Sequence, residues 1–474
     1  MNRSFSRTVC FLLMSVCLGA GVLCAQQKAA PESTAMPTVI PVPLEAQPSA
    51  HFDVEAATRA YLNQIPPEAK KRSDAYFEGG YWLQLWDFLV GAGISLLLLN
   101  LRWSAGLRNW AERVTRFKPV HTFIYWAEYL VLTTLLGFPM TVYEGYIRER
   151  QYGLATQTFG PWLNDQFKGL LVGLVLGGIL VVVLFGVVRR LRRTWWIWGA
   201  VVVVLFTVFQ ALIYPVYILP VFNKVTRLDD PRITGPILSM ARANGIPARE
   251  VYQVDASRQS TRISANVSGF GRTLRITLND NLLRRGSPEE IQAIMGHEMG
   301  HYVMGHVYSG ISFFGVLMVI FFALLRWALD ASLKRWGERW QIRGIGDTAV
   351  LPLVVLLGSI FFFVLTPIMN TQSRNTEYEA DIFGLNASRQ PDGEAQADIH
   401  LAEYRKMEPG PIEEWIFYDH PSGRTRIHSA MRWKAENLQL FTPPASKEGA
   451  PSGVESGPPA AGSAQPAPKA GPKP

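Results

Sequence analysis

Six long apolar runs limit what this chain can fold into more than any other feature of its sequence. They lie near residues 84–101, 121–140, 167–188, 196–219, 310–329 and 349–369. Each approaches the ~20 residues with which an α-helix crosses the hydrocarbon core of a bilayer. A run such as GLLVGLVLGGILVVVLFGVV at 169–188 is too long and too uniformly apolar for a helix inside a soluble domain. The sequence therefore predicts a mainly α, multi-pass membrane protein.

Basic residues gather in alternate loops between these runs. The loops at 102–118, 189–193 and 330–348 are rich in Lys and Arg, whereas the loop at 141–166 balances its arginines with acidic residues. By the positive-inside rule, the basic loops face the cytoplasm, and the polar regions that follow the fourth and sixth runs face the other side. The net charge of +8 is then mainly a signal of topology. We therefore expect the lipid bilayer as a partner, and no nucleic acid.

The two ends of the chain differ in composition from the rest. Basic residues precede an apolar run within residues 1–25, which predicts a signal peptide, with an uncleaved first membrane helix as the alternative. Residues 26–54 are rich in Pro, Ala and Gln and are expected to form a flexible linker. Residues 442–474 are rich in Pro and Ala, have little to bury, and are expected to be a disordered tail.

The remaining chain divides into membrane and polar segments. We assign membrane helices to 55–219, a polar region to 220–309, a membrane hairpin to 310–369 and a second polar region to 370–441. Within the first polar region, VYQVDA at 251–256 and TLRITLND at 273–280 predict short strands, because apolar and polar side chains alternate. A helix is predicted from Ser287, because the sequence SPEE combines a capping box with proline at the first helical position.

The pentapeptide HEMGH at 297–301, inside this helix, has the pattern of a metal site. Residues four apart lie on one face of a helix, so the imidazoles of His297 and His301 converge on one ion. Glu298 lies beside the ion, where it suits a base that polarises a metal-bound water. The three cysteines all lie within the first 25 residues, so the other ligands must be His or carboxylate.

Glu377 is the best candidate for a third protein ligand. His301 precedes the fifth apolar run by nine residues, and Glu377 follows the sixth by eight. If both helices continue out of the membrane, at ~1.5 Å per residue, the two ligands reach a similar height beyond the bilayer. Asp381 lies one turn after Glu377 and can accept a hydrogen bond from a ligand imidazole. Glu379 points elsewhere, and we assign His306 to the interfacial end of the helix.

Three motifs together resemble the zinc-dependent CAAX prenyl endopeptidases of type I, in a bacterial member. They are HEMGH at 297–301, NTQSRNTEYEAD at 370–381 and DHPSGRTRI at 419–427. The resemblance extends over roughly residues 55–440. It implies a barrel of membrane helices around a water-filled chamber, capped by a zincin-type α+β catalytic domain. In a bacterial member we expect the inner membrane as the location, and the positive-inside rule, not the resemblance, places the catalytic domain on the non-cytoplasmic side.

The resemblance also implies roles for individual residues. One Zn²⁺ per chain would be bound by His297, His301 and Glu377, with Glu298 as the catalytic base and Asp381 as the residue that orients a ligand. His420 and Arg426 match the family's residues near the substrate and the developing oxyanion. The substrate would lie extended along an edge strand that contains Ala265, Asn266 and Val267.

These observations predict a zinc metalloendopeptidase that hydrolyses peptide bonds by a zinc-bound water activated by Glu298. Its substrates are peptides or proteins, and two substrate classes stay open: C-terminal or lipid-modified peptides, and misfolded envelope or exported proteins. A non-catalytic membrane scaffold or transporter is the alternative from another class, because Glu128 lies within an apolar run.

Overall fold

The computed structural model describes residues 39–269 and 274–441. The expected signal peptide at 1–25 and the expected tail at 442–474 lie outside these residues. Within them, six helical segments are long and apolar enough to cross a membrane. They are α3 (Pro67–Asn100), α5 (Lys118–Val142) with η4 (Tyr143–Arg148) and α6 (Glu149–Gln151), α7 (Phe159–Arg190), α8 (Trp195–Ile213) with η5 (Tyr214–Ile218) and α9 (Leu219–Phe222), α13 (His306–Trp340), and α14 (Leu351–Ser388).

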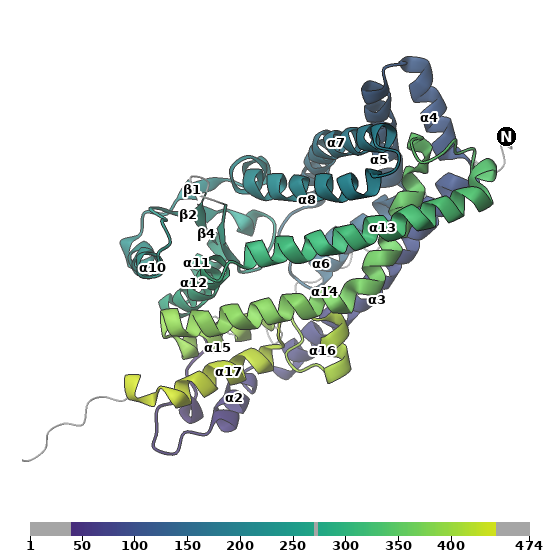
Figure 1. Ribbon diagram of the computed structural model, residues 1–474. Coiled ribbons are helices and arrows are strands. Elements are labelled where there is room, and N and C mark those ends of the chain that lie inside the picture. Colours follow the sequence, from purple (N-terminus) through teal and green to yellow (C-terminus); the bar gives the residue numbers. More distant parts are fainter. Residues whose placement is uncertain (1–38, 270–273, 442–474) are drawn as a thin grey trace, which may run out of the picture.

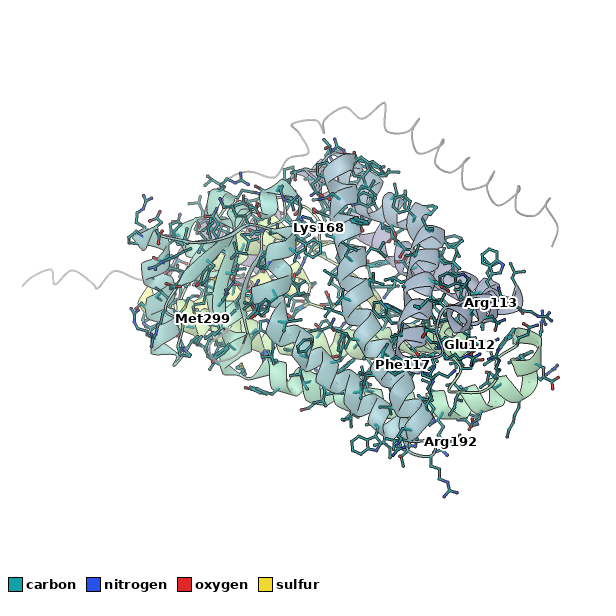
Figure 2. The ribbon with its side chains drawn as sticks, turned by 90° about the horizontal axis from the view of Figure 1, so that it is seen from above. Glu112, Arg113, Phe117, Lys168, Arg192 and Met299 are labelled. Atoms are coloured by element: carbon teal, nitrogen blue, oxygen red, sulfur yellow. The ribbon has the colours of Figure 1, made fainter. Side chains whose placement is uncertain are left out.

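The membrane helices share one apolar core, in which residues such as Leu98, Tyr125, Phe185 and Phe321 are buried. The short helix α4 (Trp103–Val114) connects α3 to α5 at one end of this bundle. The basic loops meet at that end, where Arg108 forms a buried ion pair with Asp347. Figure 2 shows Glu112, Arg113, Phe117 and Arg192 at this end, far from Met299. The chain therefore separates its basic loops from the polar domain at the other end.

A small sheet lies at the opposite end, beside α10 (Pro231–Ala243), α11 (Asp280–Arg285) and α12 (Pro288–Val303) (Figure 1). Its four strands run in the order β1 (Val225–Arg227), β2 (Val251–Val254), β4 (Arg275–Asn279) and β3 (Ala265–Ser268). β2 and β4 are parallel, whereas β3 is antiparallel to β4, with Val267 opposite Ile276. Among residues 39–269 and 274–441, β3 pairs only with β4, so it is an edge strand whose outer side can accept another extended chain.

The helix α12 begins as the sequence predicts, with one difference in its cap. The side chain of Ser287 accepts a hydrogen bond from the backbone N–H of Glu290, and Pro288 is the first helical residue. The side chain of Glu290, however, does not return to the cap but contacts His400 on α15 (Pro391–Leu401) at 3.0 Å. The predicted reciprocal half of the capping box is therefore replaced by a contact between helices.

Residues 39–53 correct the prediction of a flexible linker over 26–54. Ile40 and Ala46 are buried in a core that also contains Tyr61 of α2 (Val54–Leu62) and Ile427 of α17 (Gly423–Glu436). The ammonium group of Lys434 donates a hydrogen bond to the backbone oxygen of Ala46 at 2.6 Å. This proline-rich stretch packs because its few apolar side chains fit between the helices of the second polar region. That region also contains the short helix α16 (Pro411–Phe417).

The helices α12 and α13 are separate, which corrects the expectation of two helices that both continue from the membrane hairpin. α12 ends at Val303, and α13 begins at His306 after Gly305, whose φ is +70°. Glycine adopts this left-handed conformation without steric cost, so the chain can turn sharply here. α14, in contrast, runs without interruption from Leu351 to Ser388 and carries Glu377 beyond its apolar part.

Glycines let α12 and α14 approach each other at backbone distance. A Cβ atom added to Gly384 would lie 2.7 Å from the backbone nitrogen of His297, and one added to Gly296 would lie 2.9 Å from the oxygen of Gly384. A Cβ atom added to Gly300 would lie 3.2 Å from the Cα atom of Ala380. Because the opposing atoms belong to the backbone, a larger residue at these positions must push the helices apart.

We expect Gly384→Ala to lower the stability of the folded protein by about 1–3 kcal/mol, the usual cost of inserting atoms into a packed contact. Thermal unfolding of the purified protein in detergent would measure this as a lower midpoint. Gly186→Ala on α7 is the matched control, since no atom lies within 4 Å of the added Cβ there. Equal midpoints for the two variants would contradict the close crossing.

Candidate metal centre

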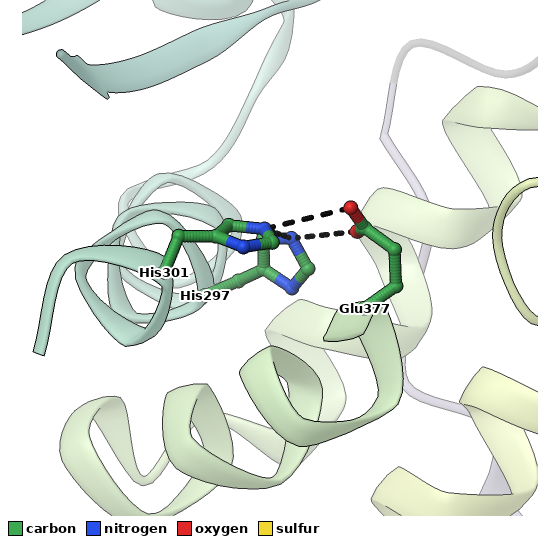
Figure 3. A group of neighbouring side chains, drawn as sticks. All are labelled: His297, His301 and Glu377. Carbon is green, nitrogen blue, oxygen red and sulfur yellow. Dashed lines mark hydrogen bonds and ion pairs between the residues drawn. The ribbon is translucent and has the colours of Figure 1, made fainter. Parts of the chain in front are cut away.

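His297 and His301 on α12 face Glu377 on α14 across the helix crossing (Figure 3). The two Nε2 atoms of the histidines lie 3.1 Å apart. The Nε2 atom of His297 is 3.2 Å from Oε2 of Glu377, and that of His301 is 3.6 Å from Oε1. The helix period brings the two imidazoles to one face, and the crossing brings the carboxylate to the same point.

The donor set fits a tetrahedral zinc ion. Ligand atoms that lie 2.0–2.1 Å from a tetrahedral zinc are about 3.3 Å from one another, close to the separations of the three side chains. Oε2 of Glu377 is buried and has no hydrogen-bond partner among the described residues, as expected of an atom that binds a cation. Three protein ligands would leave a fourth position for water or substrate, as in catalytic zinc sites.

The site also favours positive charge at its centre. Burial lowers the pKa of His297, but its hydrogen bond with Asp381 and the nearby carboxylate of Glu377 outweigh this effect and raise the pKa to about 10. A ligand imidazole must be neutral, so a metal ion would displace a proton when it binds. The carboxylates around His297 therefore prepare the site for a cation.

Asp381 lies behind His297, as the sequence reasoning expected of a residue that orients a ligand. Its Oδ1 is 2.7 Å from Nδ1 of His297, which turns Nε2 of the same ring toward Glu377. Arg426 on α17 holds Asp381 in turn, through hydrogen bonds of 2.9 and 2.6 Å to its two carboxylate oxygens. Asp381 is thus fixed from two sides.

The position of Arg426 argues against its expected role at the oxyanion. Its guanidinium is buried and donates to Asp381, to Asp398 at 3.0 Å and to Glu394 at 2.9 Å. Its donors are taken up by three carboxylates, and one of these, Asp381, is the side chain behind His297. The sequence placed Arg426 near the metal centre but gave no sign of Glu394 and Asp398.

One guanidinium cannot neutralise three buried carboxylates. Burial raises the pKa of Glu394, and it raises the pKa of Asp398 to about 8, against the opposing charge of Arg426. Asp398 therefore holds a proton near neutral pH, while Asp381 stays ionised beside Arg426 and His297. The proton lowers the charge buried next to the metal centre.

Glu298 and His420 flank the ligands in a cleft of about 230 Å³. Burial raises the pKa of Glu298, although the nearby His297 and His301 oppose the shift. A carboxylate with a raised pKa accepts a proton more readily than an ordinary one, as a general base requires. The Nε2 atom of His420 is 3.4 Å from Oε2 of Glu377, and its Nδ1 is 2.8 Å from Oδ1 of Asp419. The His420 ring is therefore at the metal centre.

The edge strand β3 forms one wall of this cleft, but only in part. Ser264 and Ala265 line the cleft together with Glu298. Asn266 and Val267 lie further along β3, and the side chain of Asn266 accepts a hydrogen bond from Ser268. Of the three residues expected to contact substrate, Ala265 is the one that lines the same cleft as the candidate base.

A larger cavity of about 1080 Å³ lies between the membrane helices and the polar domain. Its walls include Glu144, Arg148 and Asp165 from the membrane part, and it shares Tyr404 and Arg405 with the cleft. The cleft therefore adjoins the chamber that the sequence resemblance implies.

His306 and Glu379 belong to the surroundings of the metal centre, a role that sequence reasoning missed. Nδ1 of His306 is 3.0 Å from Nδ1 of His301, and Nε2 of His306 is 3.2 Å from Oε2 of Glu379. A continuous helix after His301 would place His306 about half a turn away from the face of the ligands. The break at Gly305 changes this direction, and only that glycine could have signalled it.

Comparisons with known proteins agree with this arrangement. The family model described as "Peptidase family M48" matches residues 227–434, and that described as "CAAX prenyl protease N-terminal, five membrane helices" matches residues 54–224. An uncharacterized metalloprotease of Bacillus subtilis, YhfN, is 29% identical over 352 residues, which cover 73% of this chain and 82% of that protein. CAAX prenyl protease 1 of Saccharomyces cerevisiae is 27% identical over 319 residues, which cover 62% of this chain and 69% of that protein.

The crystal structure of Ste24p from S. mikatae superimposes with a TM-score of 0.67 at 21% sequence identity. The match covers 78% of this chain and 90% of that one. It confirms the predicted fold, in which a helical membrane barrel carries a smaller α+β domain.

We expect Asp398→Asn to change how stability depends on pH. The pKa of about 8 in the folded protein lies above the ordinary value of 3.8, so the folded state holds the proton more tightly. The stability that this proton contributes is complete below about pH 4 and is lost as the pH rises through about 8. Asn cannot ionise, so the variant should keep its stability better than the parent between about pH 5 and pH 9.

Thermal midpoints of the two metal-free proteins across this pH range would test the prediction, because all other titrating groups are shared. If the thermal midpoints of parent and variant changed in parallel with pH, Asp398 would be ionised throughout this range.

Proposed function

We propose that the chain is a membrane metalloprotease of peptidase family M48, in line with the family models that match residues 54–224 and 227–434, and that it is a zinc endopeptidase with one ion per chain. The observation that carries the proposal is the meeting of His297, His301 and Glu377 at separations that suit tetrahedral zinc. Glu298 and His420 beside these ligands supply the remaining groups that peptide hydrolysis needs.

A zinc ion held there would supply Lewis acidity, lowering the pKa of water and polarising a peptide carbonyl. Glu298 accepts the proton of the attacking water and later delivers it to the leaving amine. The raised pKa of Glu298 suits both steps, because the group must gain and lose a proton in each cycle. His420 is placed to donate a hydrogen bond to the oxyanion that develops at the carbonyl.

Arg426 has a positioning role in this proposal. It holds Asp381, and Asp381 fixes the His297 ring so that its Nε2 atom is presented to the metal. The substrate backbone would pair with the outer edge of β3 near Ala265, which places a scissile bond beside Glu298. Asn266 and Val267 would contact the substrate further along the strand.

The basic loops support a location in the bacterial inner membrane, with the metal centre on the non-cytoplasmic side. They lie at the end of the molecule opposite Met299, which follows Glu298 on α12 (Figure 2). By the positive-inside rule that end is cytoplasmic, so the chamber opens away from the cytoplasm.

Two substrate classes are compatible with the chamber. The relatives named CAAX prenyl protease support the processing of C-terminal, lipid-modified peptides. The proposed topology favours a second candidate, the removal of misfolded envelope or exported proteins without prenyl specificity. Purified protein given a prenylated peptide, its unmodified twin and a loosely folded polypeptide would separate them. Faster cleavage of the prenylated form supports the first class, and equal cleavage of the twins supports the second.

We expect Glu298→Gln to bind zinc like the parent and to lose peptidase activity by about 10²-fold or more, because the amide cannot accept the proton. Elemental analysis would give the zinc content, and cleavage of an unstructured polypeptide would give the rate. His301→Ala is the companion variant and should lose both zinc and activity. Full activity of the glutamine variant would refute the role of Glu298, and a parent without zinc would refute the zinc site.

A further inference from the structure

We propose that His306 is a positioning residue for the metal centre, because it accepts a hydrogen bond from the ring of His301. The inference rests on the proposed zinc site and deepens it. His306 itself is not a ligand, since its Nδ1 atom contacts Nδ1 of His301, on the side of that ring away from His297 and Glu377.

The contacts form a chain of three groups that starts at the metal centre. Nε2 of His301 faces His297 and Glu377, while Nδ1 of the same ring lies 3.0 Å from Nδ1 of His306. The other nitrogen of His306, Nε2, is 3.2 Å from Oε2 of Glu379. Nδ1 of His301 and both ring nitrogens of His306 thus have one partner each in this chain.

Proton positions in this chain follow from the role of His301 as a ligand. A metal-binding Nε2 offers its lone pair to the ion, so the proton of a neutral His301 must be on Nδ1. That N–H can only donate to His306, whose Nδ1 therefore accepts and carries no proton. The proton of His306 is then on Nε2, from which it donates to the carboxylate of Glu379. The chain admits one arrangement of protons, so each group fixes the tautomer of the next.

The fold gives His306 little freedom to leave this position. Gly305, with a φ of +70°, turns the chain after α12, so that His306 folds back on the helix that carries His301. The side chain of His306 is 7% exposed, whereas that of Glu379 is 55% exposed. Water can replace an exposed carboxylate, but it has little access to the buried contact between the two rings. The substitutions that test the proposal are therefore made at His306 and not at Glu379.

Each of the two metal-binding histidines would then have a hydrogen-bond partner at its Nδ1 atom, and the two partners come from different parts of the chain. His297 is fixed by Asp381, and His301 is fixed by His306 at the first turn of a membrane helix. Loss of such a partner typically weakens metal affinity or activity by 10–100-fold.

The experiment compares His306→Leu with His306→Asn in the full-length protein. The two side chains have nearly the same shape, but only Asn offers an oxygen in the place of the Nδ1 acceptor. His51→Leu serves as the control, because His51 is exposed and outside the site. The metal-free proteins would be titrated with Zn²⁺ in competition with a chromophoric chelator, and thermal unfolding without metal would show that each is folded.

We expect His306→Leu to bind zinc about 10–100-fold more weakly than the parent and His306→Asn to stay within about threefold of it. The control should bind like the parent. Should the leucine variant not fold, His306→Ala takes its place in the comparison. Equal affinities of parent and leucine variant, or equal losses in the leucine and asparagine variants, would overturn the positioning role alone. A parent that takes up no zinc would overturn the proposed function as well.

Discussion

The close crossing of α12 and α14 is the constraint on which the metal centre depends. Its ligands come from two helices, so the imidazoles and the carboxylate meet only where the backbones nearly touch. Glycines at 296, 300 and 384 make this possible, since a Cβ atom at any of them would lie within 3.2 Å of backbone atoms. Because α14 is continuous from the membrane, the crossing also sets the height of Glu377 relative to the bilayer.

Charge balance around the crossing decides which groups can do chemistry. Asp381 is ionised between His297 and Arg426, and the pKa of Asp398 is raised to about 8 because burial outweighs the single guanidinium nearby. A fully ionised set of carboxylates would be costly to bury. Glu298 lines the cleft beside the metal centre from α12, and burial raises its pKa as well, but Arg426 donates no hydrogen bond to it among those formed with Asp381, Glu394 and Asp398.

The sequence correctly predicted those parts of the molecule in which the spacing or length of a run of residues determines the helix. Apolar run length predicted the six membrane helices, and the spacing of His297 and His301 predicted the face of α12 that meets Glu377. It missed what depends on a single turn or on distant segments. The break at Gly305 redirects His306, and Arg426 meets Glu394 and Asp398 only through the packing of α17 on α15. Neither contact follows from a regular spacing of residues, so the sequence alone does not predict it.

The size and position of the cavities limit the form in which a substrate can reach the metal centre. A cleft of about 230 Å³ holds a few side chains and excludes a folded domain. The outer edge of β3 offers backbone hydrogen bonds to an extended chain, and it ends in the wall of the cleft at Ala265. The adjoining chamber of about 1080 Å³ is also too small for a folded protein of ordinary size. In the proposed peptidase, these volumes would select first for unfolded or terminal segments, and only then for side chains near the scissile bond.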